Sequence, residues 1–412
     1  EITFDEDGSI DDITPVNLIT GDFSTGDLSL GQTSGTVTIL NDADIDGTLT
    51  LGDISNVESS INTNTSSIST NSSAISSIND TTLANFTSGT RVYGSSDNIG
   101  LGTNTLSNIT SGDYNTAIGS EVLEYNTSGT ANTGLGAFAL NRNTTGFRNT
   151  AIGRAALYSN TVGYNNVAIG YNSLNKNISG DGNVSLGGSS LYANTTGNNN
   201  VAIGSIALYK NTIGTQNTAI GYATLYSNVS GNYNLAFGRE SLYSNTTGSR
   251  NAAFGSQALY SNLSGDYNVA IGNNALYSNK SGDYNVAFGT QALYSNTEGN
   301  FNIAIGNKAL YLNTIGSRNA AFGLQSLYSN VDGNNNTAAG FRALYSNLSG
   351  NYNLAFGSES LYSNTIGNKN AAFGLQSLYS NVDGSNNNAV GNRALYSNVS
   401  GDFNAAFGTQ AL

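Results

Sequence analysis

The sequence predicts an all-β protein whose main body is a repetitive β-solenoid, or β-roll, of 19 units of 17 residues. Three observations predict this fold. Glycine recurs every 17 residues from Gly102 to Gly408, at 19 positions without insertion or deletion. Asparagine stands four residues before each of these glycines, and leucine stands four residues after each. A helix pair needs a repeat of about 34 residues, so a unit of this length is expected to form one coil of a stack.

Each unit follows the pattern N-x-A-[IF]-G-x-x-[AS]-L-Y-x-N-x-x-G-x-x. It holds two short apolar runs, each followed by Gly and Asn turn signals, which predicts short strands joined by turns. Glycine suits a corner that needs a positive φ. Because identical columns lie about 4.8 Å apart in such a stack, the asparagines are expected to form amide ladders between coils.

Side-chain alternation predicts which residues face the interior of a coil. Side chains of the Ile118 and Leu123 type are expected to point inward and form a thin apolar core. The column of small residues that contains Ala117 is then expected to face the opposite way. Its small size indicates the close approach of another backbone, either at a corner of the coil or at an interface between subunits.

A tyrosine column follows the leucine and holds 14 tyrosines between Tyr158 and Tyr396, with Asn175 as the exception. An exposed aromatic ladder could bind sugars by stacking. The alternative is that the rings pack half-buried with their hydroxyls at the rim. The candidate binding residues are Tyr209, Tyr226, Tyr243, Tyr260, Tyr277 and Tyr294.

The segment before the repeats is expected to contain three parts. Residues 1–50 alternate apolar and polar residues around Gly and Asp turns, which predicts an acidic, β-rich shoulder domain. Residues 51–82 carry heptads and are expected to form a short trimeric coiled-coil neck, with an extended Ser/Thr-rich linker as the alternative. Residues 83–97 are a connector, and residues 98–412 form the solenoid. The heptad positions are Ile54, Val57, Ile61, Asn64, Ile68, Asn71, Ile75 and Ile78.

One motif near the N-terminus resembles a calcium-binding loop. Asp42, Asp44, Asp46 and Asp53 have the spacing of oxygen ligands in such a loop, with Gly47 at its sharp turn. The last ligand is Asp rather than Glu, and helical patterns do not flank the motif on both sides. A Ca²⁺ site and an acidic β-turn on a solvated face therefore both remain open, and no other cofactor is expected.

Composition excludes several chemistries. The chain has 412 residues and contains no His, Cys, Met or Trp, so it has no catalytic triad with His, no thiol nucleophile and no imidazole or thiolate metal site. Because Met is absent, we expect the chain to be part of a longer protein. The net charge is −13, and residues 1–60 hold 13 acidic and no basic residues, which argues against nucleic acid as a partner. No apolar run is long enough to insert into a membrane.

The repeat "NTAIGRAALYSNTVGYNNVAIGYNSL" is similar to the tandem units of tail-fibre-domain proteins of bacteriophages and marine bacteria. The shorter V-A-I-G motif resembles the head repeats of trimeric autotransporter adhesins, although the adhesin head unit is shorter than 17 residues. The stretch "NTNTSSISTNSSAIS" resembles the necks and stalks of such fibres. The resemblance covers about residues 51–412. It implies parallel β-rolls assembled as a homotrimer.

From the resemblance we expect a non-enzymatic fibre, either a phage tail fibre or a cell-surface adhesin. It would lie in the virion tail or outside the cell and attach to a glycan or protein receptor. The alternative is a purely structural filament or spacer whose adhesive tip lies outside this chain. An ice-binding array is disfavoured because the Thr127, Thr144, Thr161 column is interrupted at Ile178. A polysaccharide-degrading β-helix is disfavoured because acids in the repeats occur singly.

Overall fold

The structure, a computed structural model, describes residues 55–77, 90–93 and 97–412. The chain divides into two units, residues 1–75 and 76–412, and each is described by itself. The predicted acidic β-rich domain of residues 1–50 lies outside the described residues, as does most of the 83–97 connector.

One helix, α1, spans Ser55–Ser77 within the segment predicted to form a coiled coil. Side chains from residue 62 to residue 73 are all exposed, including Ile68 at 67%. The heptad pattern therefore lies on a helix. A coiled coil also needs partner helices, so the trimeric neck stays a prediction.

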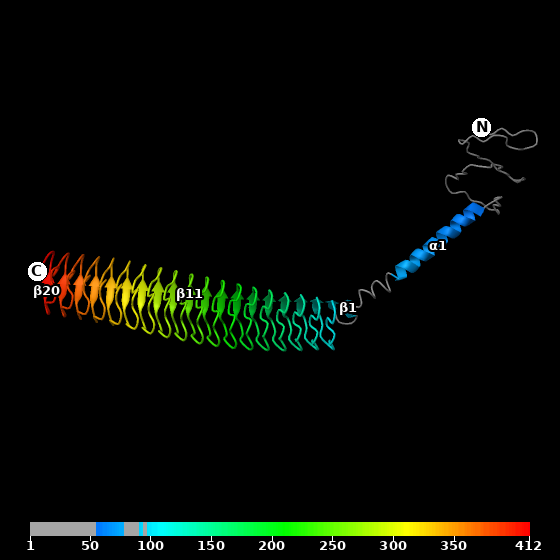
Figure 1. Ribbon diagram of the computed structural model, residues 1–412, viewed down its shortest axis with the longest axis horizontal. Helices are drawn as coiled ribbons and strands as arrows, with labels where there is room; N and C mark the ends of the chain where they lie inside the picture. The colour runs from blue at the N-terminus through cyan, green and yellow to red at the C-terminus, as the bar shows by residue number, and fades with distance from the viewer. Residues whose placement is uncertain (1–54, 78–89, 94–96) are drawn as a thin grey trace, which may run out of the picture. The chain divides into compact units, whose positions relative to one another are not determined.

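The second unit is a parallel β-solenoid in which short strands stack one per coil, as Figure 1 shows. β1 pairs antiparallel with β2, and each strand from β2 to β20 pairs parallel with the next strand in the chain. The repeat prediction is confirmed. The strands are β1 (Thr90–Tyr93), β2 (Asn98–Leu101), β3 (Thr116–Ile118), β4 (Thr133–Leu135), β5 (Thr150–Ile152), β6 (Val167–Ile169), β7 (Val184–Leu186), β8 (Val201–Ile203), β9 (Thr218–Ile220), β10 (Leu235–Phe237), β11 (Ala252–Phe254), β12 (Val269–Ile271), β13 (Val286–Phe288), β14 (Ile303–Ile305), β15 (Ala320–Phe322), β16 (Thr337–Ala339), β17 (Leu354–Phe356), β18 (Ala371–Phe373), β19 (Asn388–Val390) and β20 (Ala405–Phe407).

The strand register follows the sequence repeat. Ala236 of β10 pairs with Ala253 of β11, which pairs with Ala270 of β12, so each column of the repeat becomes a row along the stack. The prediction of two strands per coil is only half right, because the Ala-Leu-Tyr run forms a turn. Its backbone still bonds between coils, as the N–H of Leu259 donates to the carbonyl of Ala275 at 3.0 Å.

The turn has an unusual backbone that explains why this run is not a strand. Ala258 and Leu259 are consecutive, yet both are fully buried, whereas successive side chains of a strand point to opposite faces. Leu259 has a φ of 52°, and the leucine of every coil has a positive φ. The left-handed conformation brings the leucine inward next to its neighbour, although it costs about 1–2 kcal/mol for a residue with a side chain.

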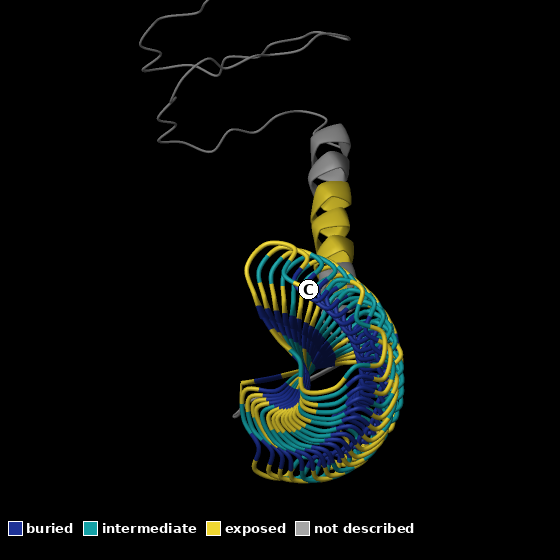
Figure 2. Ribbon diagram, turned by 90° about the vertical axis from the view of Figure 1, so that its left-hand side faces the viewer, coloured by how far each residue is buried: buried dark blue, intermediate teal, exposed yellow. Residues whose placement is uncertain are grey.

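The core differs from the expected one. Ala117 and Leu123 are both fully buried, whereas Ile118 is 36% exposed. The predicted inward direction of the Ile118 column is therefore wrong, and so is the interpretation of the Ala117 column as a subunit interface. Figure 2 shows the buried residues as continuous bands along the superimposed coils. The interior is narrow because its columns are one leucine and two small residues per coil, such as Ala253 and Ala258 with Leu259.

The two asparagine columns form the predicted ladders inside the solenoid. Asn143 Nδ2 donates to Asn126 Oδ1 at 2.7 Å, and Asn160 Nδ2 donates to Asn143 Oδ1 at 2.7 Å. In the second ladder, Asn132 Nδ2 donates to Asn115 Oδ1 at 3.1 Å. These amides are buried and also bond to backbone carbonyls, so each asparagine satisfies polar groups that the thin core would otherwise leave unpaired.

The two glycine columns have different roles. Gly255 has a φ of 137°, as expected for a corner glycine. Gly265, in the second column, has no positive φ, but a Cβ there would lie 2.5 Å from the carbonyl oxygen of Gly282. The second glycine is therefore required by the close approach of neighbouring coils rather than by the turn conformation.

Candidate binding surfaces of the solenoid

The predicted tyrosine column forms a continuous stack along one side of the solenoid. Thirteen rings from Tyr192 to Tyr396 stack in sequence, with centroids 5.0–5.3 Å apart and planes within 15° of parallel. All six candidate binding tyrosines belong to this stack. Each follows a buried leucine and is itself half-buried, because the positive φ of the leucine directs the next side chain toward the rim of the coil.

The stacked geometry limits how the tyrosine ladder could bind a ligand. The two faces of Tyr243 are covered by Tyr226 and Tyr260, each with its ring centroid 5.1 Å away. A sugar cannot stack on a covered ring face, so within the ladder only the ring edges and hydroxyl groups remain accessible. Binding by these six tyrosines stays a prediction, with a contact made at ring edges rather than ring faces.

Burial changes the acidity of the ladder. It raises the pKa of six ladder tyrosines, and neighbouring phenol groups of the stack add to the effect, because a tyrosinate next to another is unfavourable. Burial therefore favours the protonated hydroxyl, a hydrogen-bond donor, at these six positions. The six are Tyr209, Tyr243, Tyr260, Tyr294, Tyr328 and Tyr379.

Cationic side chains from neighbouring columns lie against the ladder at intervals. Lys176 Nζ is 5.1 Å from the centroid of the Tyr192 ring, and Lys210 Nζ is 5.2 Å from that of Tyr226. Such contacts are worth about 0.5–1 kcal/mol at exposed sites. Each of these contacts places a positive charge beside one coil, and the ring stack stays continuous there.

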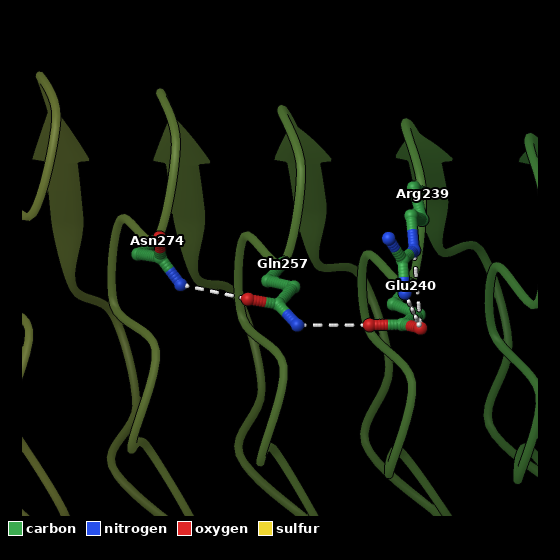
Figure 3. Close-up of polar contacts among 4 residues, drawn as sticks. All are labelled: Arg239, Glu240, Gln257 and Asn274. Carbon is green, nitrogen blue, oxygen red and sulfur yellow. Dashed lines mark hydrogen bonds and ion pairs between the residues drawn. The ribbon is translucent and has the colours of Figure 1, made fainter.

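A polar ladder runs along the column two residues after the corner glycine. Figure 3 shows Glu240, Gln257 and Asn274 from three successive coils. Gln257 Nε2 donates to Glu240 Oε2 at 2.8 Å, and Asn274 Nδ2 donates to Gln257 Oε1 at 3.0 Å. The hydrogen bond from Gln257 lowers the pKa of Glu240, and Arg239 at 3.0 Å adds to this against the opposing effect of burial. Glu240 is therefore a paired carboxylate.

An exposed aromatic strip, which the sequence analysis did not single out, lies on the residues just before the second asparagine ladder. We define it as Tyr233, Arg250, Tyr267, Tyr284 and Phe301. The Tyr267 and Tyr284 rings stack at 4.8 Å, and those of Tyr284 and Phe301 at 5.0 Å. Arg250 lies between Tyr233 and Tyr267, 5.4 and 5.1 Å from their ring centroids. The signal was present as the aromatic recurrence in "GNYN", "GDYN" and "GNFN".

Carboxylates accompany this strip in the adjacent column. The backbone N–H of Ser249 donates to Asp266 Oδ1, and that of Asp266 donates to Asp283 Oδ1, both at 2.7 Å. Each aspartate therefore has one oxygen committed to the backbone of the preceding coil. Exposed rings beside carboxylates and amides are a combination that suits a polar ligand with apolar patches.

The candidate calcium loop of Asp42, Asp44, Asp46 and Asp53 lies outside the described residues. In the part of the chain that the structure describes, no group of three or more acidic residues is placed to hold a metal ion. Among those same residues, no helix is long and apolar enough to cross a membrane.

Comparison with known proteins does not place this chain in a family. No protein-family model, curated protein or solved structure matches this chain. The functional proposal therefore depends on the solenoid itself and on the surfaces described above.

Proposed function

We propose that this protein is a non-enzymatic fibre, a phage tail fibre or a cell-surface adhesin, that mediates attachment to a host receptor or surface. It would act as a homotrimer in the virion tail or outside the cell, and its partner would be a glycan or a protein. The observation that carries the proposal is the uninterrupted stack from β2 to β20, in which each strand pairs only with its neighbours.

Two properties of the stack suit attachment. Backbone hydrogen bonds and buried asparagine ladders join every coil to the next, which makes a stiff element that can hold a binding surface away from its base. The same surface columns recur in each coil, so weak contacts can act together and raise the overall affinity well above that of one coil. The tyrosine ladder and the exposed aromatic strip are the candidate contact surfaces.

The second candidate function is a structural spacer that carries an adhesive tip elsewhere. The closed geometry of the tyrosine ladder favours it, because ring faces that stack on one another stabilise the coil rather than a ligand. In this case the side columns would serve rigidity, and binding would not depend on which coils are present.

Two matched deletions separate these functions. Residues 229–279 and 314–364 each comprise 51 residues, which is three whole units, so removing either preserves the register of the remaining coils. The first removes Tyr233, Arg250 and Tyr267 of the aromatic strip, and the second leaves the strip intact. The labelled full chain and both deletion variants are tested on a glycan array and on a panel of bacterial cells.

Attachment by the strip predicts that the 229–279 deletion weakens binding at least tenfold more than the 314–364 deletion. Attachment distributed over all coils predicts an equal loss in both. Binding that neither deletion changes, or no binding of the full chain to any glycan or cell, would favour the spacer and contradict attachment by the coils.

A further inference from the structure

The outward side of the long β-sheet is an apolar surface that nothing in the described chain covers. In the last three residues of each strand from β2 to β20, the middle residue faces the core and the two residues beside it face outward. In β13, for example, Ala287 faces the core, and Val286 and Phe288 face outward. We name these outward residues the apolar sheet face. Its 38 positions, from Ile99 and Leu101 to Ala405 and Phe407, contain five threonines, one asparagine and no charged residue. The charges of the repeats lie in other columns.

Large side chains on this face are well exposed. Phe288 is 52% exposed, and Ile305 and Phe322 are each 40% exposed. Nineteen strands at about 4.8 Å, each three residues long at about 3.3 Å per residue, make a face of roughly 900 Å². Monomeric proteins rarely expose a continuous apolar patch larger than a few hundred Å². The area also matches the roughly 800 Å² that each partner buries in a standard stable interface.

We infer that the apolar sheet face packs against the same face of a second copy of this chain, parallel and in register. A partner must match a row of outward residues that repeats once per strand over 19 strands, and a second copy has this period by construction. The heptads of α1, with Ile68 exposed, would suit a parallel partner of the same kind. The inference deepens the proposed fibre by locating its subunit interface on this face.

The first test is the native mass of the full chain by light scattering on a sizing column. One chain has a mass of 42.6 kDa, so wild-type protein is expected at three times that value, the mass of the proposed homotrimer. A variant with Phe288→Lys, Ile305→Lys and Phe322→Lys places three charges on the face and is expected at 42.6 kDa with an unchanged circular dichroism spectrum. A second variant with Thr at these positions keeps β-propensity and is expected to associate more weakly than wild type.

The matched control carries three added charges on an exposed turn of three successive coils: Thr247→Lys, Ser264→Lys and Ser281→Lys. It is expected to keep the wild-type mass. The inference would be overturned if the wild-type protein had a native mass of 42.6 kDa. It would also be overturned if the face variant folded and kept the native mass of the wild-type assembly. A control that dissociates together with the face variant would also overturn it, because dissociation would then follow charge rather than the face.

Single cysteines test the orientation, because the chain has none of its own. Ile118→Cys and Val390→Cys lie near opposite ends of the stack on the apolar sheet face. If the copies are parallel and in register, each variant forms a disulfide-linked pair of chains on oxidation, whereas Ser281→Cys on the turn does not. Antiparallel copies would link only when the two variants are mixed, and cover by the protein's own residues 1–54 would give no link between chains.

These tests are independent of attachment. A native mass of several chains with face-specific disulfide links, but no binding to cells or glycans, would support this interface and contradict the adhesive function. Binding to cells or glycans by a chain that is monomeric at the working concentration would support the adhesive function and contradict this interface.

Discussion

Val122 occupies the space that a side chain at Gly134 would need: a Cβ placed on Gly134 would collide with the Cγ1 atom of Val122. Gly134 stands in the column that is otherwise mostly alanine, and Val122 stands in the neighbouring column of Ala, Ser and Thr. The two departures from the repeat compensate each other at this place in the narrow core.

The first prediction concerns this pair. Gly134→Ala is expected to lower the free energy of unfolding by about 1–3 kcal/mol, because the added methyl group overpacks the core against Val122. Val122→Ala should lower it by about 1.5 kcal/mol or more, because two methyl groups worth about 0.8 kcal/mol each leave the core and a cavity remains. Denaturant unfolding measures both.

The double variant Val122→Ala with Gly134→Ala restores the common pattern of the repeat. It is expected to be more stable than either single variant and close to wild type. Additive losses in the double variant would show that the two residues do not share one space.

The second prediction compares two glycines. Gly255→Ala places a side chain at a φ of 137°, with its Cβ 2.5 Å from the carbonyl oxygen of Gly272. The backbone conformation alone should cost about 1–3 kcal/mol, and the collision between coils adds to it. Gly188→Ala is the control, since a Cβ there has nothing within 4 Å. Its thermal midpoint should stay near that of wild type, and equal losses at both positions would contradict the close-approach argument.

The third prediction concerns the buried amide ladder. Asn262 Nδ2 donates to Asn245 Oδ1 at 2.7 Å and to the carbonyl of Gly265 at 3.0 Å. Asn262→Asp removes both donors and buries a carboxylate beside two oxygens, which should cost about 3 kcal/mol or more at neutral pH. Burial should also raise the pKa of the new carboxyl above its ordinary value of about 3.9.

The sign of the pH dependence follows from that raised pKa. Stability should be partly recovered at low pH, where the acid is protonated and can donate, and lost as the pH rises through the raised pKa. Asn232→Asp is the control, because Asn232 Oδ1 accepts bonds from the N–H and the hydroxyl of Thr215 at 2.8 and 2.9 Å, roles that a carboxylate keeps, and aspartates occur naturally in that column. Unfolding midpoints of both variants between about pH 4 and about pH 7 measure the difference.

The fourth prediction concerns alkaline pH. Burial raises the pKa of Tyr243 and Tyr260 in the folded ladder, whereas tyrosines of the unfolded chain titrate near about 10. The stabilising effect of the raised pKa is complete below about pH 10 and is lost as the pH rises toward the folded value, because the unfolded chain releases protons first. Unfolding midpoints between about pH 8 and about pH 11 should therefore fall.

The double variant Tyr243→Phe with Tyr260→Phe keeps the ring stack and removes two of these groups. Its midpoint should fall less steeply with pH than that of wild type. A slope as steep as that of wild type would mean that the ladder is not the source of the alkaline loss.

Much of the fold follows from the sequence by itself. The 17-residue recurrence of Gly, Asn and Leu determined the number of coils and their parallel stacking, because a period without insertions leaves each residue beside its own counterpart. The same recurrence predicted the asparagine ladders and placed the tyrosines in one column. It carried no information on ring faces, which the stacking of Tyr243 between Tyr226 and Tyr260 settled.

Only the tertiary structure decided which side of each strand is the inside. Hydrophobicity favoured the Ile118 column as core, yet Ala117 is buried and Ile118 is exposed. The reason is volume: the left-handed Leu123 turns inward and fills the narrow coil, so only a small residue such as Ala117 fits in the strand that packs against it. The larger apolar side chains are left on the outward face, where the interior offers them no room.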